Sequence, residues 1–313
     1  MMSTVSLSKT IEYIPVVCAA DDNYAMPLAV MASSVLANLA EDKKLLLFVI
    51  DGGIKEHNKR KILNSQDANR CDVKWLNPPT DELLERMKIS GHLSIVTYYR
   101  LLLPELISSE FEKLIYLDCD LVVNRDLNKL WEIDLEKNYL LAVPEIRFPY
   151  MSQILPNFDK LGLPSDCKYF NAGVLLINLE KWRTDQIGLK AIEYVEQNLE
   201  HILFHDQDAL NVVLAGQWGE LEPKWNQTPF IHDYSSWKDS PFDEEAFNDA
   251  INKPCIIHFA SRFKPWNTYQ YGEQDKKLFH KYLDMTAWRG KRFTLWMAIY
   301  KKLMRIILRN NKR

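Results

Sequence analysis

Short, continuous apolar runs alternate with amphipathic stretches along the first 80 residues of the chain. Residues 13–20 (YIPVVCAA) and 44–51 (KLLLFVID) are nearly uninterrupted apolar runs, which is typical of strands that are buried on both faces. Between them, residues 26–39 (MPLAVMASSVLANL) carry apolar side chains at helical spacing. We therefore expect a strand–helix–strand unit, which is how a parallel sheet begins.

The alternation of strand-like and helix-like segments continues to about residue 260. The pattern predicts a helix over 97–106 that Pro104 should stop or kink. Other expected strands are 72–76, 114–117, 139–143 and 255–259; a strand is expected to run into a helix over 172–183, and further helices to cover 54–66 and 206–216. No linker interrupts the pattern, so we expect one α/β domain over residues 1–285, with the late strand in the same sheet as the others.

Cysteine usage and hydropathy narrow the cellular setting. The five cysteines are an odd number and are widely spread, with no C-x-x-C pair, which argues against a disulfide framework and a zinc ribbon. We see no secretory signal and no apolar stretch long enough to cross a bilayer. The expectation is a cytoplasmic protein in a reducing compartment.

The charge is distributed unevenly. From residue 289 to the end there are nine Lys or Arg and no acid, so the other 288 residues carry −3 − 9 = −12. Residues 286–313 predict a basic amphipathic helical tail, with Phe293, Trp296, Tyr300, Leu303 and Ile307 interleaved among the cations. That composition is typical of a helix lying at the inner face of a membrane, or of a helix packed on the domain with a solvated basic face. The acidic body disfavours nucleic acid as a partner.

Two aspartates, Asp118 and Asp120, follow the expected strand 114–117. In a regular strand their side chains project to the same side, with Cys119 on the other. Two such carboxylates repel each other unless a cation lies between them, and oxygen ligands suit Mg²⁺ or Mn²⁺. His258 could add a nitrogen ligand, which favours Mn²⁺. The same spacing also fits two turn aspartates that cap the next element, or the first motif of haloacid-dehalogenase-like phosphatases.

Four blocks, taken in order, make the chain resemble glycosyltransferase family 8, the retaining enzymes with a GT-A fold. The blocks are residues 19–36 (AADDNYAMPLAVMASSVL), 97–123 with YLDCDLVV, 169–183 (YFNAGVLLINLEKWR) with DQDALN at 206–211, and 256–266 (IIHFASRFKPW). The resemblance implies a Rossmann-like, nucleotide-binding GT-A fold with a mixed central sheet flanked by helices.

The resemblance also implies roles for individual residues. Asp118, Asp120 and His258 match the metal ligands, and Lys264 matches a lysine that contacts the diphosphate. Residues matched to the nucleotide are Ala19, Asp21, Asn23, Tyr24 and Lys264; those matched to the donor sugar are Arg100, Asn171, Ala172, Gly173, Asp206 and Gln207; those matched to catalysis are Gln207, Asp206 and Lys264. Taken singly, each has a structural alternative, such as a helix cap for Asp21 or Asp206.

The implied activity is Mn²⁺-dependent transfer of a hexose, with Mg²⁺ as the alternative ion. The expected donor is UDP-glucose or UDP-galactose, and the expected acceptor is a saccharide, lipid-linked if the tail binds a membrane, as in lipopolysaccharide synthesis. Gln207 is a poor nucleophile, which favours a front-face reaction over a covalent intermediate on Asp206 or Asp208. Two positions depart from the family pattern: Ser261 replaces a glycine, and Glu145 replaces an aspartate. A phosphatase and a non-catalytic UDP-sugar-binding protein stay open as alternatives.

Overall fold

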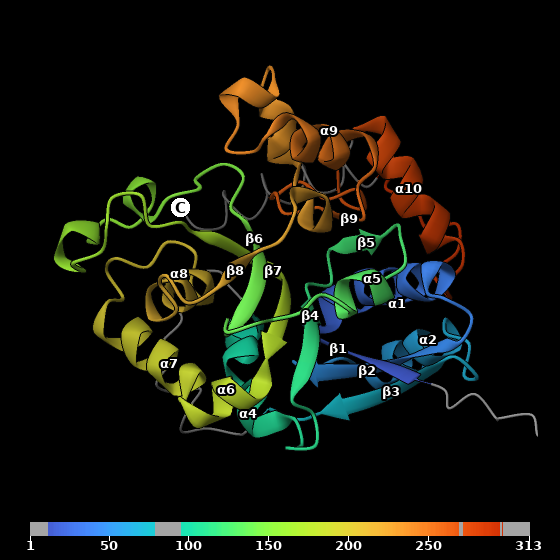
Figure 1. The fold of residues 1–313 in the computed structure, drawn as a ribbon. Coiled ribbons are helices and arrows are strands. Elements are labelled where there is room, and N and C mark those ends of the chain that lie inside the picture. The colour runs from blue at the N-terminus through green and yellow to red at the C-terminus, as the bar shows by residue number, and fades with distance from the viewer. Residues whose placement is uncertain (1–11, 79–94, 269–271, 295, 297–313) are drawn as a thin grey trace, which may run out of the picture.

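A seven-stranded mixed sheet forms the centre of the molecule (Figure 1). The computed structural model describes residues 12–78, 95–268, 272–294 and 296. The strand order is β3-β2-β1-β4-β7-β6-β8. The strands are β1 Glu12–Ala20, β2 Lys43–Asp51, β3 Cys71–Leu76, β4 Lys113–Leu117, β6 Leu140–Pro144, β7 Phe170–Asn178 and β8 Gly219–Glu220. Neighbouring strands are parallel except where β7 pairs with β4 and β6, so the predicted mixed α/β sheet is confirmed.

The central strands bury both of their faces. In β1, Val16 and Cys18 point into a hydrophobic core on one side of the sheet, whereas Val17 points into a second core on the other side. β4 alternates in the same way, with Ile115 on the first side and Tyr116 on the second. The uninterrupted apolar runs of the sequence follow from this two-sided burial, because neither face meets water.

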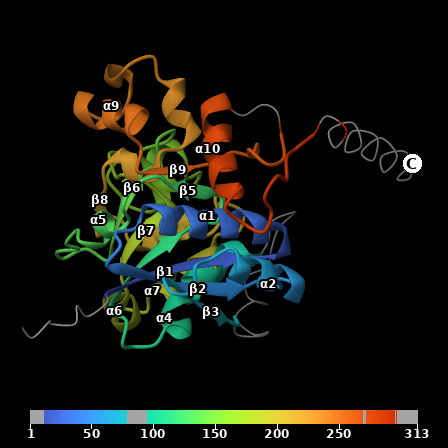
Figure 2. The ribbon, with the colours of Figure 1, turned by 90° about the vertical axis from the view of Figure 1, so that its right-hand side faces the viewer.

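Helices cover both faces of the sheet, as the two views in Figures 1 and 2 show. One face carries α1 Ala25–Asn38, α2 Glu56–Asn64 and α10 Glu273–Leu283. The other carries α4 Leu103–Leu106, α6 Leu179–Thr184, α7 Ile187–Gln197 and α8 Asp206–Val213. α5 Asn128–Trp131 adds Leu130 to the core on the first face, whereas α9 Glu244–Asn252 packs through Phe247 and Ala250 in a separate cluster.

A second sheet holds the late strand, which corrects one expectation. Ile256–His258 forms β9 and pairs antiparallel with β5 Leu121–Val123, with Leu121 opposite His258. Of the described strands, only these two form this sheet. β5 directly follows the turn that carries Asp118 and Asp120, so β9 still brings His258 next to the two aspartates without joining the main sheet.

Pro104, which was expected to stop or kink a helix, lies instead in the first turn of one. Residues Ile95–Leu102 form a 3-10 helix, and α4 begins at Leu103 with Pro104 in its first turn. The missing N–H of a proline costs nothing at that position, because the first N–H groups of a helix have no intrahelical partner. The segment therefore changes helix type before the proline and continues through it.

The chain packs on the domain as far as Trp288. Trp288, beyond the expected domain boundary at residue 285, is 8% exposed and belongs to the core beside α1. Most of the predicted basic tail, residues 297–313, lies outside the described residues. Within the part of the chain that the structure describes, no helix has the length and apolar character needed to span a membrane.

Candidate active site

A cavity of about 650 Å³ opens where β1 and β4 end and β7 begins. Ligands in α/β proteins commonly bind at this edge of the sheet. Of the fourteen residues singled out from the sequence, all but Gly173 and Lys264 line it: Ala19, Asp21, Asn23, Tyr24, Arg100, Asp118, Asp120, Asn171, Ala172, Asp206, Gln207 and His258. The four sequence blocks therefore meet at one place.

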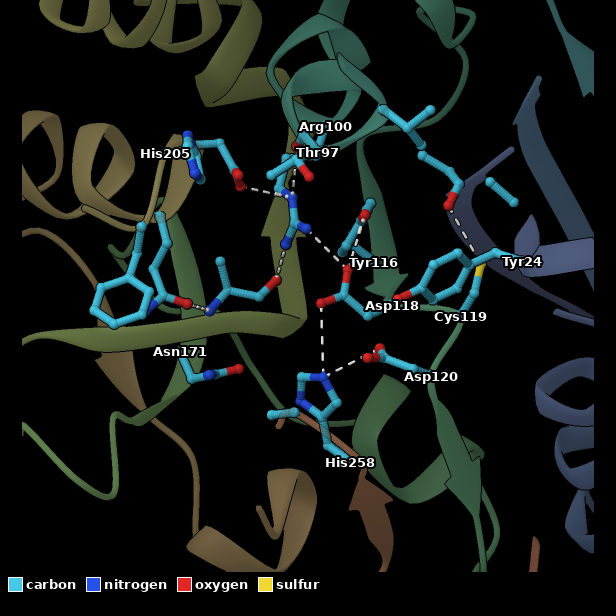
Figure 3. Close-up of a pocket in the computed structure, with 18 of the residues that line it drawn as sticks. Tyr24, Thr97, Arg100, Tyr116, Asp118, Cys119, Asp120, Asn171, His205 and His258 are labelled. Carbon is cyan, nitrogen blue, oxygen red and sulfur yellow. Dashed lines mark hydrogen bonds and ion pairs between the residues drawn. The ribbon is translucent and has the colours of Figure 1, made fainter. Parts of the chain in front are cut away.

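Asp118, Asp120 and His258 form a cluster suited to a divalent cation (Figure 3). One ligand atom from each lies within 4.8 Å of the other two. His258 Nε2 is 3.3 Å from Asp120 Oδ1 and 3.8 Å from Asp118 Oδ2. Two carboxylate oxygens and an imidazole nitrogen are a donor set for Mn²⁺ or Mg²⁺, so the residues present fit the implied ion.

The two aspartates reach this cluster from a turn. They lie between β4 and β5, outside either strand, so the strand alternation invoked for the D-x-D spacing does not apply. Cys119 between them donates its thiol to the carbonyl of Ala19, with 3.3 Å between sulfur and oxygen (Figure 3). That contact joins this turn to the end of β1 and places both beside the cavity.

Arg100 is buried at the centre of the site and holds two carboxylates. Its Nη2 donates to Asp118 Oδ1 at 2.9 Å, and its Nε lies 2.8 Å from Asp206 Oδ2. The guanidinium also packs over the ring of Tyr116, at 4.4 Å, and donates to the carbonyl of Ala172. Burial disfavours its charge, but the two aspartates outweigh burial and raise the pKa of Arg100. Arg100 therefore stays charged and fixes the orientation of Asp118.

One guanidinium serves two carboxylates, and Asp206 is the more deeply buried of the pair, 2% exposed. Burial raises the pKa of Asp206 to about 7, against the lowering effect of Arg100. Asp118 shares its Oδ1 with the Tyr116 hydroxyl, which donates at 3.1 Å. Its Oδ2 is the oxygen that faces His258.

Lys264 contacts Asp120 of the metal-site cluster but is not among the residues that line the cavity. Its ammonium pairs with Asp120 Oδ2 and donates to the carbonyl of Phe259 at 2.6 Å. Burial raises the pKa of the Asp120 carboxyl, but Lys264 and His258 outweigh burial and hold that pKa well below its usual range. Asp120 is therefore ionised, as a metal ligand must be.

The turn after β1 forms one corner of the cavity. Asp21 caps the 3-10 helix Asp22–Tyr24, accepting from the backbone N–H groups of Asn23 and Tyr24 at 2.9 and 3.1 Å. Asp22 instead ties the turn to α2, through Lys55 and Asn58. Capping and a place in the cavity lining thus coexist in Asp21, as the sequence allowed. The ring of Tyr24 meets Trp266 edge-on, with 6.3 Å between centroids.

The opposite wall is built from the start of α8. Gln207 accepts from the Ala172 N–H at 2.9 Å and donates to the Tyr169 hydroxyl at 3.2 Å, so its amide is fixed. Asp208 accepts from Tyr169, Leu203 and Phe204 and is fully buried. Asp208 therefore orders the start of the helix and does not face the cavity.

Gly173 lies directly against the metal-site cluster. A Cβ there would be 2.3 Å from His258 Cε1 and 2.9 Å from Asp118 Oδ2. The Gly173 carbonyl also accepts from the Asp118 N–H at 2.8 Å. The absence of a side chain is what allows β7 to approach two of the three ligands this closely.

Ser261, where the family pattern has glycine, stays in its own turn. Its hydroxyl donates to the Phe263 carbonyl at 2.8 Å and accepts from the Phe263 N–H at 3.2 Å. Its neighbour Ala260, rather than Ser261, lines the cavity. The serine thus replaces backbone freedom with a local hydrogen-bonded turn.

Several residues of the site were not identified from the sequence. Asn226 hydrogen-bonds His258, and Tyr116 hydrogen-bonds Asp118. Arg147 lies between the rings of Phe148 and Phe230, 5.3 Å from each centroid, and all three line the cavity. Tyr116 could be found from the strand pattern, which places it two residues before Asp118. The others lie in segments with no periodic pattern, so nothing marked them.

Comparisons with known proteins give the family. The protein-family model described as Glycosyl transferase family 8 matches residues 15–270 of the chain. General stress protein A of Bacillus subtilis is 32% identical over 280 residues, which cover 88% of this chain and 95% of that protein. Lipopolysaccharide 1,2-glucosyltransferase of Escherichia coli is 27% identical over 275 residues, covering 86% and 78%.

Among solved structures, the galactosyltransferase LgtC, in complex with donor and acceptor sugar analogues, has a TM-score of 0.75 at 30% identity. The match covers 89% of this chain and 100% of LgtC. The family model spans most of the sequence, and the fold agrees over nearly all of a solved relative. The chain therefore belongs to glycosyltransferase family 8 and is a glycosyltransferase with a GT-A-type fold.

Proposed function

We propose that this glycosyltransferase moves glucose or galactose from a UDP-sugar to a saccharide acceptor, with retention of configuration and with Mn²⁺ held by Asp118, Asp120 and His258. The observation that carries the proposal is the position of this cluster in the cavity. The Asp21–Tyr24 corner lies in the same lining, and so do Arg100 and Gln207. A diphosphate bound at the cluster would place the uracil base at the Asp21–Tyr24 corner and the donor sugar beside Arg100 and Gln207.

The ion, when bound, would act as a Lewis acid for the departing diphosphate. The protein's own residues prepare the site for it. Arg100 and Tyr116 hold one oxygen of Asp118, which leaves the other oxygen directed at the cluster. Lys264 supplies a positive charge next to Asp120, where negative charge develops as UDP leaves.

Retention fits a front-face reaction better than a covalent intermediate. Asp206 is committed to Arg100, and Asp208 to Tyr169 and two backbone N–H groups. Gln207, the matched residue on the sugar side, offers an amide, which is a poor nucleophile. We propose that the leaving phosphate takes the proton of the acceptor hydroxyl. Mass-spectrometric capture of a glycosyl adduct on Asp206, Asp208 or Glu145 would refute this mechanism.

Part of the cavity lining is aromatic and includes an exposed arginine, Arg147. Phe148, Phe204 and Phe230 form this part together with Arg147. Aromatic rings are suited to the apolar faces of sugars, and Arg147 forms no ion pair with a carboxylate of the described residues. We propose that the saccharide acceptor enters along this side, beside Glu145.

The basic tail supports a proposal about location. Residues 289–313 carry nine cations and no acid, which would attract an anionic membrane surface. We propose a cytoplasmic protein that binds the inner face of the membrane and uses a lipid-linked acceptor. Removal of residues 297–313 should abolish co-sedimentation with phosphatidylglycerol-containing vesicles and leave donor hydrolysis intact.

Donor hydrolysis tests the proposed activity. UDP-glucose and UDP-galactose are incubated with the protein with and without Mn²⁺, and released UDP is measured. Asp120→Asn should lower the rate of UDP release by about a hundredfold or more. Asp243→Asn, which removes a carboxylate from the cap of α9, should leave this rate unchanged. Equal turnover in the Asp120 variant would refute the metal site. Phosphate release from p-nitrophenyl phosphate with Mg²⁺ would favour the phosphatase alternative, and binding of UDP without turnover would favour a binding protein.

A further inference from the structure

Four buried side chains form a hydrogen-bonded chain that ends at the metal site. His258 Nδ1 is 2.9 Å from Asn226 Oδ1, and Asn226 Nδ2 donates to Asn171 Oδ1 at 2.8 Å. Asn171 Nδ2 donates in turn to Glu145 Oε2 at 2.8 Å. All four side chains belong to residues that are at most 8% exposed, and Asn226 is fully buried. Water therefore has little access to these hydrogen bonds, and each donor must meet an acceptor.

The direction of the chain is fixed at Asn171. An amide can in principle be placed either way round, since its oxygen and nitrogen have similar shapes. Here Asn171 Oδ1 accepts from the backbone N–H of Gly173 at 3.0 Å, and a backbone N–H can only donate. The carboxylate of Glu145 accepts from Asn171 Nδ2. The reverse placement would set oxygen against oxygen at Glu145 and N–H against N–H at Gly173.

The fixed amide of Asn171 determines the two groups that follow it. Because Asn171 presents its oxygen, Asn226 must present its Nδ2 to Asn171 and its Oδ1 to His258. An amide oxygen accepts and does not donate, so His258 Nδ1 must carry the proton. In the neutral ring, the lone pair then lies on Nε2, which faces Asp120 Oδ1 and Asp118 Oδ2 at 3.3 and 3.8 Å.

We propose that Asn226 is a positioning residue that keeps the proton of His258 on Nδ1 and so presents the Nε2 lone pair to the metal ion. This inference rests on the proposed role of His258 as a metal ligand. Histidine ligands commonly need such a partner on the second ring nitrogen, and its loss lowers metal affinity by about 10–100-fold. Asn226 does not line the cavity, so its effect on the ion would pass through His258, while its Nδ2 holds Asn171.

Two substitutions separate this role from simple packing. Asn226→Leu keeps the approximate volume and removes the acceptor for Nδ1, whereas Asn226→Asp keeps an acceptor on Nδ1 and loses the donor to Asn171. Asn157→Leu is the matched control, because Asn157 is also a buried asparagine, 5% exposed, and hydrogen-bonds Tyr194 and Asn198 instead of the site. Circular dichroism and thermal melting show whether each variant is folded.

The first readout needs no metal. Two-bond ¹H–¹⁵N spectra of the full chain labelled with ¹⁵N-histidine, recorded over a series of pH values, show which nitrogen of His258 carries the proton in the neutral ring. We expect Nδ1–H in the unsubstituted protein, in Asn226→Asp and in Asn157→Leu. Asn226→Leu should show a mixture of tautomers. An Nε2–H ring in the unsubstituted protein, or an unchanged Nδ1–H ring in folded Asn226→Leu, would overturn the proposal.

The second readout is the affinity for Mn²⁺ alone, measured by the loss of the electron paramagnetic resonance signal of free Mn²⁺. Asn226→Leu should bind about 10–100-fold more weakly, and Asn226→Asp and Asn157→Leu should stay within about threefold of the unsubstituted chain. Equal affinity in Asn226→Leu would overturn the proposal. If the unsubstituted protein shows Nδ1–H but binds no Mn²⁺, the proposed metal site fails, and with it any ligand role for this tautomer.

Discussion

Gly173→Ala offers a sharp test of how the site is assembled, because it adds one methyl group beside two proposed ligands. The new Cβ would lie 2.3 Å from His258 Cε1, 2.7 Å from its Nδ1 and 2.9 Å from Asp118 Oδ2. Carbon atoms in contact need about 3.5 Å, so the imidazole and β7 must separate by about 1.2 Å. Neither is free to move, since His258 is held by Asn226 and β7 lies in the centre of the sheet.

The size of the effect follows from that displacement. Overpacking of this kind costs about 1–3 kcal/mol of folding stability. A misplacement of about 1 Å at a catalytic centre can cost about a hundredfold in rate, or about 2.7 kcal/mol. If the proposed Mn²⁺-dependent hydrolysis of a UDP-sugar holds, we expect Gly173→Ala to lower it by about two orders of magnitude, with the protein still folded. Turnover and urea unfolding are measured on the same preparation.

Gly219→Ala is the matched control. Its Cβ would approach Leu141 Cδ2 at 2.5 Å and Asn138 Nδ2 at 2.8 Å, but both atoms are the ends of flexible side chains, and Gly219 itself lies in the edge strand β8. This variant should unfold at nearly the same urea concentration and keep its turnover. If Gly173→Ala is folded and has turnover within threefold of the unsubstituted protein, the close approach of β7 does not position the ligands.

Three further predictions concern the groups around the site and one helix cap. Arg100→Met leaves Asp118 and Asp206 without their shared cation, so the free energy of unfolding measured in urea should fall by about 3–5 kcal/mol. Adding Asp206→Asn should restore part of this loss, and additive losses in the double variant would contradict the shared ion pair. The pKa of Asp206 is raised to about 7 in the folded protein, so between about pH 4 and pH 7 the folded protein holds a proton that the unfolded chain has released. The free energy of unfolding should therefore fall as the pH rises through this range. An equal dependence on pH in Asp206→Asn would refute this. Asn178 caps α6 by accepting from the Lys181 N–H at 3.0 Å, so Asn178→Ala should cost about 1 kcal/mol in urea unfolding with unchanged donor hydrolysis.

The sequence was most informative where one physical effect dominates. β1 and β2 are buried on both faces, so their apolar runs predicted them to within a residue of the observed bounds. For residues 95–106 the apolar spacing favours one continuous α-helix, but the observed backbone is a 3-10 helix up to Leu102. Pro104 was expected to stop or kink the helix because the sequence does not show where a helix turn begins.

The candidate site was only partly predictable for a similar reason. The four blocks marked the residues that face the cavity, because those blocks carry the resemblance to the family. Asn226 lies in a short 3-10 helix, Pro223–Asn226, and its role depends on contacts with Asn171 and His258. These partners are 55 and 32 residues away along the chain, and no local pattern carries such a relation. β9 was misplaced for the same reason, because its apolar run does not say which strand it pairs with.

The two-sheet arrangement sets an order in which the parts of this site become available during synthesis. All seven strands of the main sheet lie before residue 221, whereas β9 and Lys264 come later in the chain. Asp118 and His258 are 258 − 118 = 140 residues apart. A chain emerging from the ribosome therefore contains the strands of its main sheet, Arg100 with its two aspartates, and Gln207 well before it contains His258, the third proposed ligand. The proposed cation site is completed only when β9 pairs with β5, so binding of an ion there would follow the formation of this second sheet rather than initiate folding.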